Sequence, residues 1–171
     1  MMIRDAARDD AAAIVAIYNY FIVNTPITFE EQALTEGDMT QRIADVQDGH
    51  LPWIVAEFDG VVVGYAYATK WRVRNAYRYS VESTVYLAPS SVGHGTGRLL
   101  YTALIKRLSG QGYHVVIGGI ALPNAASVAL HEALGFQKVA EFKDVGFKFG
   151  RWVDVGYWQL MLSELQTRPL E

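Results

Sequence analysis

Apolar residues recur at helical spacing near the start of the chain and alternate with polar residues further on. After a short strand at Ile3–Arg4, apolar positions three or four residues apart predict a helix that is capped by Asp9 or Asp10 and ends near Tyr20. A capping-box pattern at the start of residues 35–47 predicts a second helix. Two helices therefore precede the first long strands.

The next segment is rich in β-branched and aromatic residues. Trp53–Ala56 and Val61–Lys70 are predicted strands, and the Asp59-Gly60 pair between them is typical of a hairpin turn. Tyr79–Leu87 alternates in the same way and is a third predicted strand, which Pro89 ends. This segment therefore predicts antiparallel sheet.

The rest of the chain mixes helical and strand patterns. The pattern predicts, in order, a helix over Gly97–Ser109 with Leu99, Leu100, Ala103, Leu104 and Leu108 on one face, a strand over His114–Ile120, a helix over Asn124–Leu134 closed by Gly135, and strands over Phe136–Leu162 with turns at Gly146 and Gly150. The full order is β-α-α-β-β-β-α-β-α-β-β. The predicted fold class is α/β with a mixed sheet.

Composition and charge narrow the picture. The chain has 171 residues, of which 51% are apolar and 19% charged, so we expect one well-filled core and a single domain over residues 1–171. The net charge of −3 gives no reason to expect a nucleic-acid partner. The absence of cysteine excludes disulfides, thiolate metal sites and an acyl-cysteine intermediate.

The chain shows no sign of membrane insertion or secretion. Charged residues at positions 4–10 leave no room for a secretory apolar region. The longest apolar stretch, Ile14–Val23, is too short to span a bilayer and is interrupted by Asn19. We therefore expect a cytoplasmic protein without a membrane partner. Nothing in the sequence suggests a metal.

A glycine-rich loop lies between a predicted strand and a predicted helix, over residues 92–98. Glycines allow consecutive N–H groups to point into one concavity, and the helix N-terminus adds partial positive charge. Together these features suit a pyrophosphate, although a flexible connection is the alternative interpretation. The loop lacks the Lys-Ser/Thr ending of a P-loop and the acidic residue of a dinucleotide site.

A second motif begins at Asn124 and ends at Gly135-Phe136. Taken alone, Asn124 is a helix N-cap and His131 is a residue on the surface of that helix. With the glycine loop, however, the motif resembles the GNAT superfamily of acetyltransferases. The coenzyme A loop of that superfamily reads Gln/Arg-x-x-Gly-x-Gly/Ala, which Gly95 and Gly97 match, whereas Val92 occupies the Gln/Arg position.

This resemblance implies a GNAT fold, whose mixed, mostly antiparallel sheet is splayed at the acetyl-CoA site. It implies acetyl-CoA as the cosubstrate. The pyrophosphate would contact Gly93, His94, Gly95, Thr96, Gly97 and Arg98, and the pantetheine would contact Val85, Tyr86, Leu87 and Asn124. His131 stands where the superfamily has a tyrosine that protonates the departing thiolate.

Further motifs resemble one family within the superfamily, the phosphinothricin N-acetyltransferases, over nearly the whole chain. They are Ile17-Tyr18-Asn19, Thr25-x-x-Thr28-Phe29, Trp71-x-x-Arg74-Asn75-Ala76-Tyr77, Val81-Glu82-Ser83-Thr84-Val85-Tyr86, Leu122-Pro123-Asn124, His131-Glu132-Ala133-Leu134-Gly135 and Gly146-Phe147-Lys148-x-Gly150-x-Trp152-x-Asp154-Val155-Gly156-Tyr157-Trp158-Gln159-Leu160. The family acetylates the α-amino group of phosphinothricin, a glutamate analogue. Its relatives accept methionine sulfoximine or methionine sulfone. The resemblance also implies a homodimer.

The expected chemistry assigns three catalytic roles. An α-amine is substantially protonated near neutrality, so a carboxylate must take its proton, and Glu82 is the candidate unless it is an ordinary exposed strand carboxylate. The resemblance points to the Leu87 N–H as the donor to the oxyanion and to His131 as the acid. Without cysteine, we expect direct attack in a ternary complex.

A cluster of cations suggests where an acidic acceptor binds. The cluster consists of Lys70, Arg72, Arg74 and Arg78. Arg74 is the preferred carboxylate or phosphinate ligand, because arginine can bind such groups in a bidentate way, although a solvated charged loop is the alternative. The resemblance adds Asn75, Ala76 and Tyr77 to the substrate site, and Phe29 and Glu30 are expected to close it.

Other functions stay open at this point. The acceptor could be methionine sulfoximine, methionine sulfone or another amino acid, because the pocket side chains decide this. Acetylation of protein N-termini would need an open groove, whereas the arginine-rich, aromatic-flanked segment favours a small closed site. A catalytically idle acyl-CoA-binding module is the alternative from another class, and Glu82, Asn124 and His131 argue against it.

Overall fold

The computed structural model describes residues 1–162, so the predicted domain of residues 1–171 extends beyond the described range. The predicted order of helices and strands is confirmed. The elements are β1 (Met2–Asp5), α1 (Ala11–Asn24), α2 (Glu36–Asp48), β2 (Trp53–Phe58), β3 (Val61–Lys70), β4 (Ser80–Leu87), α3 (Thr96–Gly110), β5 (Val115–Leu122), α4 (Ala125–Ala133), β6 (Gln137–Lys148) and β7 (Arg151–Met161).

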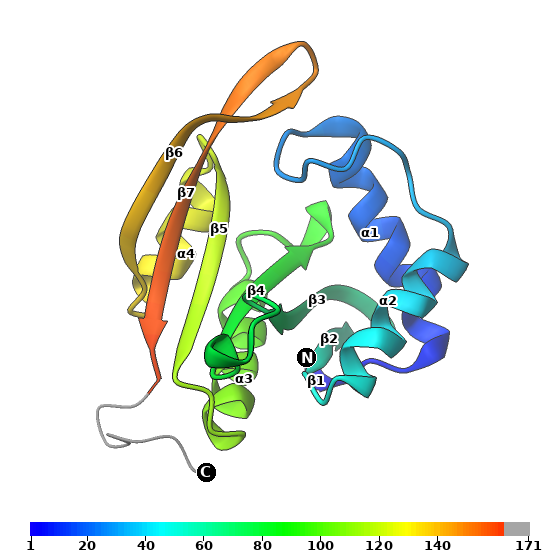
Figure 1. Ribbon diagram of the computed structural model, residues 1–171. Coiled ribbons are helices and arrows are strands. Elements are labelled where there is room, and N and C mark those ends of the chain that lie inside the picture. The colour runs from blue at the N-terminus through cyan, green and yellow to red at the C-terminus, as the bar shows by residue number, and fades with distance from the viewer. Residues whose placement is uncertain (163–171) are drawn as a thin grey trace.

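Within the described range, one seven-stranded sheet runs through the molecule in the order β1-β2-β3-β4-β5-β7-β6. Neighbouring strands are antiparallel except β4 and β5, which are parallel. The expected mixed, mostly antiparallel sheet is therefore confirmed. Because β6 lies outside β7, the C-terminal hairpin forms one edge of the sheet (Figure 1).

The sheet opens between its two parallel strands. Residues Ser80–Glu82 of β4 pair with residues Val115–Ile117 of β5. The backbone pairing stops there, although β4 continues to Leu87 and β5 to Leu122. The strands diverge and divide the molecule into two halves, visible as the gap between β4 and β5 in Figure 1. The predicted splay is confirmed.

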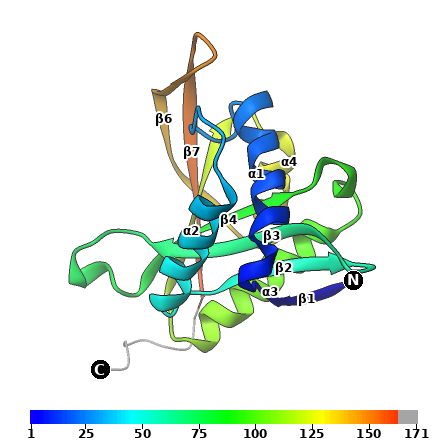
Figure 2. The same cartoon turned by 90° about the vertical axis from the view of Figure 1, so that its right-hand side faces the viewer.

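Helices cover both faces of the sheet. On β3, Tyr65 and Tyr67 face the core formed with α1 and α2, whereas Ala66 and Ala68 face the core formed with α3 and α4. This is the two-residue alternation that a strand buried on both faces requires. Figure 2 shows α1 and α2 in front of the strands and α3 below them.

The buried face of α3 is narrower than predicted. Leu100, Leu104 and Leu108 are fully buried, but Leu99 is 52% exposed. Successive residues of a helix are about 100° apart, so Leu99 is turned away from the stripe that its neighbour Leu100 occupies. The assignment of Leu99 to the buried face was wrong.

Two predicted features at the ends of elements also differ from the structure: a capping bond and a turn. Asp10 occupies the cap position of α1 but makes no side-chain capping bond; its carboxylate instead accepts hydrogen bonds from Arg4 at 2.7 and 2.8 Å and from the Ala7 N–H at 2.7 Å. Gly146 is not a turn: it lies inside β6, after an irregularity in pairing, and the hairpin turns at Phe149 and Gly150, where φ is 52° and 72°.

Residues 1–162 contain no helix that is both long and apolar enough to cross a membrane.

Candidate active site

A cavity of about 520 Å³ lies where β4 and β5 separate. It lies between the two halves of the molecule, so residues far apart in the sequence meet there. Its wall is formed by Phe21, Ile27, Ser83, Thr84, Val85, Tyr86, Leu87, Val92, Gly93, Gly95, Gly97, Arg98, Gly119, Ile120, Ala121, Asn124, Ala126, Ser127, Leu130 and His131.

The glycine loop has the geometry that an anion site needs. Gly93 and Gly95 have φ values of 85° and 80°, which side-chain-bearing residues rarely adopt. At Gly97, an added Cβ would lie 3.4 Å from both Leu87 and Leu130, so the start of α3 packs closely there. The buried hydroxyl of Thr96, at the first position of α3, has no hydrogen-bond partner. These features fit a pyrophosphate at the N-terminus of α3.

Most of the residues predicted to bind coenzyme A line this cavity. They are Val85, Tyr86, Leu87, Gly93, Gly95, Gly97, Arg98 and Asn124. The other two are close by in sequence but outside the wall: His94 is exposed in the loop, and the Thr96 side chain is buried. The Asn124 side chain accepts a hydrogen bond from the Ser127 N–H at 3.1 Å, so it also caps α4, as the alternative interpretation held.

The Leu87 N–H points towards the cleft. The Ala88 N–H donates to the Val63 carbonyl at 2.9 Å, and Leu87 is opposite Gly64. Because bonded and non-bonded pairs alternate along an antiparallel ladder, the Leu87 N–H is directed away from β3. That is the side on which β5 has diverged, so this donor is available to a ligand.

His131 is buried at the cavity wall within a chain of hydrogen bonds. Its Nδ1–H donates to the Ser127 carbonyl at 2.7 Å, and its Nε2 accepts from the Tyr101 hydroxyl at 2.9 Å. The Tyr101 hydroxyl is also 2.5 Å from the Ser83 hydroxyl. Both ring nitrogens therefore take part in hydrogen bonds, and this network holds the ring in one orientation.

Burial lowers the pKa of His131, opposed by its hydrogen bond to the Ser127 carbonyl. The neutral ring carries one N–H proton, and this proton is already hydrogen-bonded to the Ser127 carbonyl. To act as an acid, His131 would have to break this bond or take up a second proton, and burial disfavours the charged form. Its role as the acid stays a prediction.

Glu82 is not part of the cavity wall but lies next to it, on the opposite face of the sheet. Its Oε1 lies 3.2 Å from the point that a Cβ on Gly119 would occupy, and Gly119 lines the cavity. Burial raises the pKa of the Glu82 carboxyl, and the positive charge of Arg72 opposes this shift. A half-buried carboxyl of raised pKa is suited to accept a proton near neutral pH.

Two adjacent glycines of β5, Gly118 and Gly119, allow the side chains of His131 and Glu82 to approach this strand closely. Neither glycine was singled out from the sequence. A Cβ on Gly118 would lie 2.5 Å from Nε2 of His131, and one on Gly119 would meet Glu82 and Tyr157, each at 3.2 Å. The signal was present, because a glycine pair inside an apolar strand often marks a close approach.

The residues predicted to bind the substrate are not brought into the cavity. Arg74 and the short helix Asn75–Tyr77, which includes Ala76, are exposed in the connection between β3 and β4. Phe29 packs against Gly146, and Glu30 forms an ion pair with Arg42 at 2.6 Å. Of the predicted cation cluster, Arg72 is the member whose charge acts on Glu82.

Comparisons with known proteins support this picture. A family model described as an acetyltransferase (GNAT) domain matches residues 3–156. The phosphinothricin N-acetyltransferase of Streptomyces viridochromogenes is 43% identical over 92% of this chain and 85% of the relative. The L-methionine sulfoximine/L-methionine sulfone acetyltransferase of Salmonella typhimurium is 41% identical over 96% of each chain. A phosphinothricin acetyltransferase structure from Sinorhizobium meliloti, in complex with acetyl-CoA, is 38% identical, has a TM-score of 0.96 and matches 99% of this chain and 93% of its own.

The fold, the cleft and these matches define the class: the chain belongs to the GNAT acetyltransferases. Within that class, it is an acetyl-CoA-dependent N-acetyltransferase of the phosphinothricin acetyltransferase type. The family resemblance inferred from the motifs is thereby confirmed.

The buried network predicts a stability effect. Tyr101→Phe removes the hydroxyl between Ser83 and His131, and we expect the free energy of unfolding to fall by about 1–3 kcal/mol because buried polar groups lose a partner. Urea denaturation measures this change. Tyr20→Phe, at an exposed site on α1, is the control and should stay within about 0.5 kcal/mol. Equal midpoints for both variants would mean that the network does not stabilise the fold.

Proposed function

We propose that this enzyme acetylates the α-amino group of phosphinothricin or a similar small amino-acid analogue, by direct attack in a ternary complex. One observation carries the proposal: the outward Leu87 N–H lies at the same cavity wall as the glycine loop, and the half-buried Glu82 carboxyl lies beside Gly119, which also lines that wall. The names of the relatives supply the acceptor class. A cytoplasmic location, and a single domain over the whole chain, stay predictions.

Each group in the cleft has a task in this reaction. Glu82 takes a proton from the acceptor's ammonium group, so that the nitrogen lone pair can attack the thioester carbonyl. The Leu87 N–H donates to the developing oxyanion, which is worth about 3 kcal/mol for such a donor. The N–C bond forms first and gives the tetrahedral oxyanion, whose collapse breaks the C–S bond. The thiolate leaves, and the second proton lost by the attacking nitrogen converts it to the thiol. The residues of the loop and Asn124 bind the cosubstrate.

The acceptor's anionic end remains to be assigned. Arg74 is proposed as its ligand, with Asn75, Ala76 and Tyr77 beside it and with Phe29 and Glu30 closing the site. All of these lie outside the cavity wall. Methionine sulfoximine and methionine sulfone are the alternative acceptors, and the 41% identity to the Salmonella enzyme favours them as strongly as the other relatives favour phosphinothricin.

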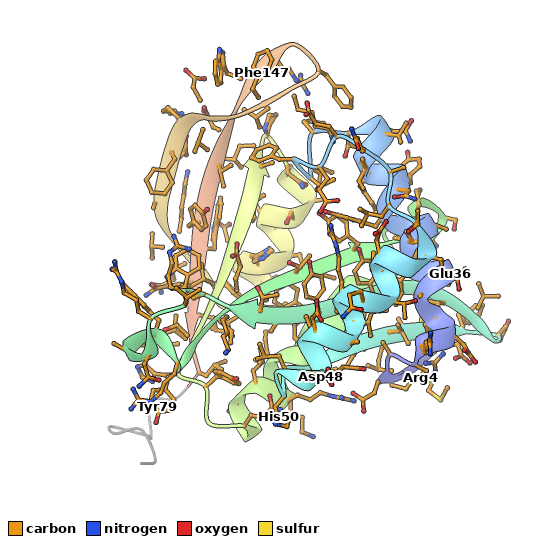
Figure 3. All side chains as sticks on the ribbon, turned by 45° about the vertical axis from the view of Figure 1, so that its right-hand side comes forward. Arg4, Glu36, Asp48, His50, Tyr79 and Phe147 are labelled. Atoms are coloured by element: carbon orange, nitrogen blue, oxygen red, sulfur yellow. The ribbon has the colours of Figure 1, made fainter. Side chains whose placement is uncertain are left out.

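A homodimer is also proposed, with its contact on the C-terminal hairpin. This hairpin exposes large apolar side chains along the edge of the sheet: Val139, Phe142, Val145, Phe147, Phe149 and Trp152, each more than half exposed. Figure 3 shows Phe147 at the outer end of the hairpin. Such a row is larger than the scattered apolar residues of a monomer surface, which favours contact with a second copy.

The base role of Glu82 predicts a selective loss. Glu82→Gln keeps the shape of the side chain but accepts no proton, so we expect kcat to fall about 100-fold or more while acetyl-CoA still binds. A thiol-release assay with phosphinothricin, methionine sulfoximine, methionine sulfone and a peptide N-terminus measures turnover, and calorimetry measures binding. Undiminished turnover in the variant would rule out Glu82 as the base. Turnover on the peptide alone would rule out the proposed acceptor class.

The electrostatics of Glu82 predict a shift in the pH profile. Glu82 must be deprotonated to act as a base. Because its pKa is raised, the acidic limb of the kcat/KM profile should lie at higher pH than the ordinary pKa of a glutamate carboxyl. The charge of Arg72 holds this pKa down, so Arg72→Gln should move the limb to higher pH. Arg74→Gln is the matched control: it should leave the limb in place and raise KM for an acidic acceptor. Identical limbs for wild type and Arg72→Gln would contradict the assignment.

The hairpin contact predicts a change in molecular mass. Trp152, which is 62% exposed, should be covered by the partner, and Trp152→Glu should shift the dimer towards the monomer because it places a charge in an apolar contact. Sedimentation equilibrium measures the mass. The control is Val61→Glu at the start of β3, away from the hairpin, which is 61% exposed and should leave the mass unchanged. A wild-type monomer at micromolar concentration would refute the proposal.

A further inference from the structure

Lys148, at the end of β6, is a buried cation. It is 2% exposed, and its ammonium donates to the Ile22 carbonyl at 2.7 Å and to the Thr28 carbonyl at 2.8 Å. Among the described residues, no carboxylate forms an ion pair with it. A lysine is rarely buried without a paired charge, so these two carbonyls must compensate for much of the lost hydration.

The position of Ile22 explains how a carbonyl can offset a charge. Ile22 lies in the last turn of α1, where carbonyls have no partner within the helix and carry the negative end of its dipole. The last turn of α1 contains no basic residue of its own. Lys148, which is 126 residues further along the chain, supplies the cation that this helix end favours.

The same side of β6 makes a second contact with the segment after α1. Gly146 is two residues before Lys148 and therefore shares its face of the strand. The Phe29 ring lies on Gly146 so closely that an added Cβ would be 2.3 Å from it. Phe147, between them, points to the other face and is 54% exposed.

These contacts form a second bridge across the cleft. The first bridge is the short pairing of Ser80–Glu82 with β5. From there the two halves diverge, and the segment of residues 25–34 reaches back towards the β6–β7 hairpin at the top of Figure 1. We call the contacts of Lys148 and Gly146 with this segment the clasp. Phe21 and Ile27, which flank Ile22 and Thr28, line the cavity.

We propose that Lys148 is a positioning residue of this enzyme: its clasp holds the segment 25–34 over the cleft and thereby sets the affinity for the amine acceptor. The proposal rests on the proposed function, because it takes the acceptor to enter between this segment and β5. The segment is tied to its own half by the Tyr18–Thr28 and Arg42–Glu30 contacts. Lys148 is a polar tie to the other half, so its loss should widen the cleft without disturbing the glycine loop.

The experiment compares Lys148→Met, which fills the same space without donors, with Lys143→Met, an exposed lysine on the same strand. Methionine sulfone and phosphinothricin serve as acceptor probes. For Lys148→Met we expect KM for the acceptor to rise about tenfold, as the loss of a charged hydrogen bond would produce. The dissociation constant of acetyl-CoA should stay within about twofold of the wild-type value. In the control variant, both this constant and KM for the acceptor should stay within the same range.

Hydrogen exchange provides a readout that needs no acceptor. In Lys148→Met, amides of residues 25–34 should exchange faster, while those of α3 and the glycine loop keep the wild-type rate. If the wild-type enzyme acetylates neither probe, the proposed function fails, whereas the exchange pattern still decides whether the clasp exists. Should Lys148→Met not fold, Gly146→Ala tests the same clasp, because its methyl group displaces Phe29.

Two results would overturn the proposal. Unchanged exchange in residues 25–34 would mean that Lys148 does not hold this segment. A joint loss of acceptor and acetyl-CoA affinity, with faster exchange throughout the chain, would mean that Lys148 only stabilises the fold. A rise in acceptor KM with local exchange, seen in both Lys148→Met and Gly146→Ala and absent from Lys143→Met, supports the positioning role.

Discussion

Backbone pairing between β4 and β5 ends at Glu82 and Ile117 although both strands continue, and the candidate active site depends on this interruption. Beyond it, each strand has an edge without a neighbouring strand, and backbone polar groups at such an edge need partners. A ligand that enters the gap can supply them. The Leu87 N–H is one such group, and the start of α3 and the glycine loop lie beside it.

The two faces of the opened sheet divide the chemistry between them. Residues on one face of β4, such as Ser83, belong to the buried network of Tyr101 and His131, while Glu82 points to the other face. The strand's two-residue alternation therefore separates a network that fixes the wall from a carboxyl suited to proton transfer. Glycines at 118 and 119 permit both approaches, because a side chain at either position would occupy the same space.

An opened sheet needs a second connection if its halves are to keep a fixed distance. Lys148 and Gly146 provide one by contacting the segment after α1 from the far edge of the sheet. The physical basis is the unsatisfied C-terminal end of a helix, which attracts a cation from any part of the chain that can reach it. The contact that caps the end of α1 therefore also contributes to the width of the cleft.

The sequence by itself determined the order of elements, the mixed sheet and the glycine loop, because these depend on local periodicity and turn residues. Its contiguous motifs carried the resemblance to the family, and that resemblance implied the splay of the sheet. Leu99 and Gly146 were misplaced, since one residue of helical rotation or one strand irregularity depends on what packs opposite. Only the tertiary structure decided that His131 has both ring nitrogens occupied, that Arg72 acts on Glu82, and that Lys148 caps α1. These are contacts between distant segments, and local sequence carries no information about which buried group will face which.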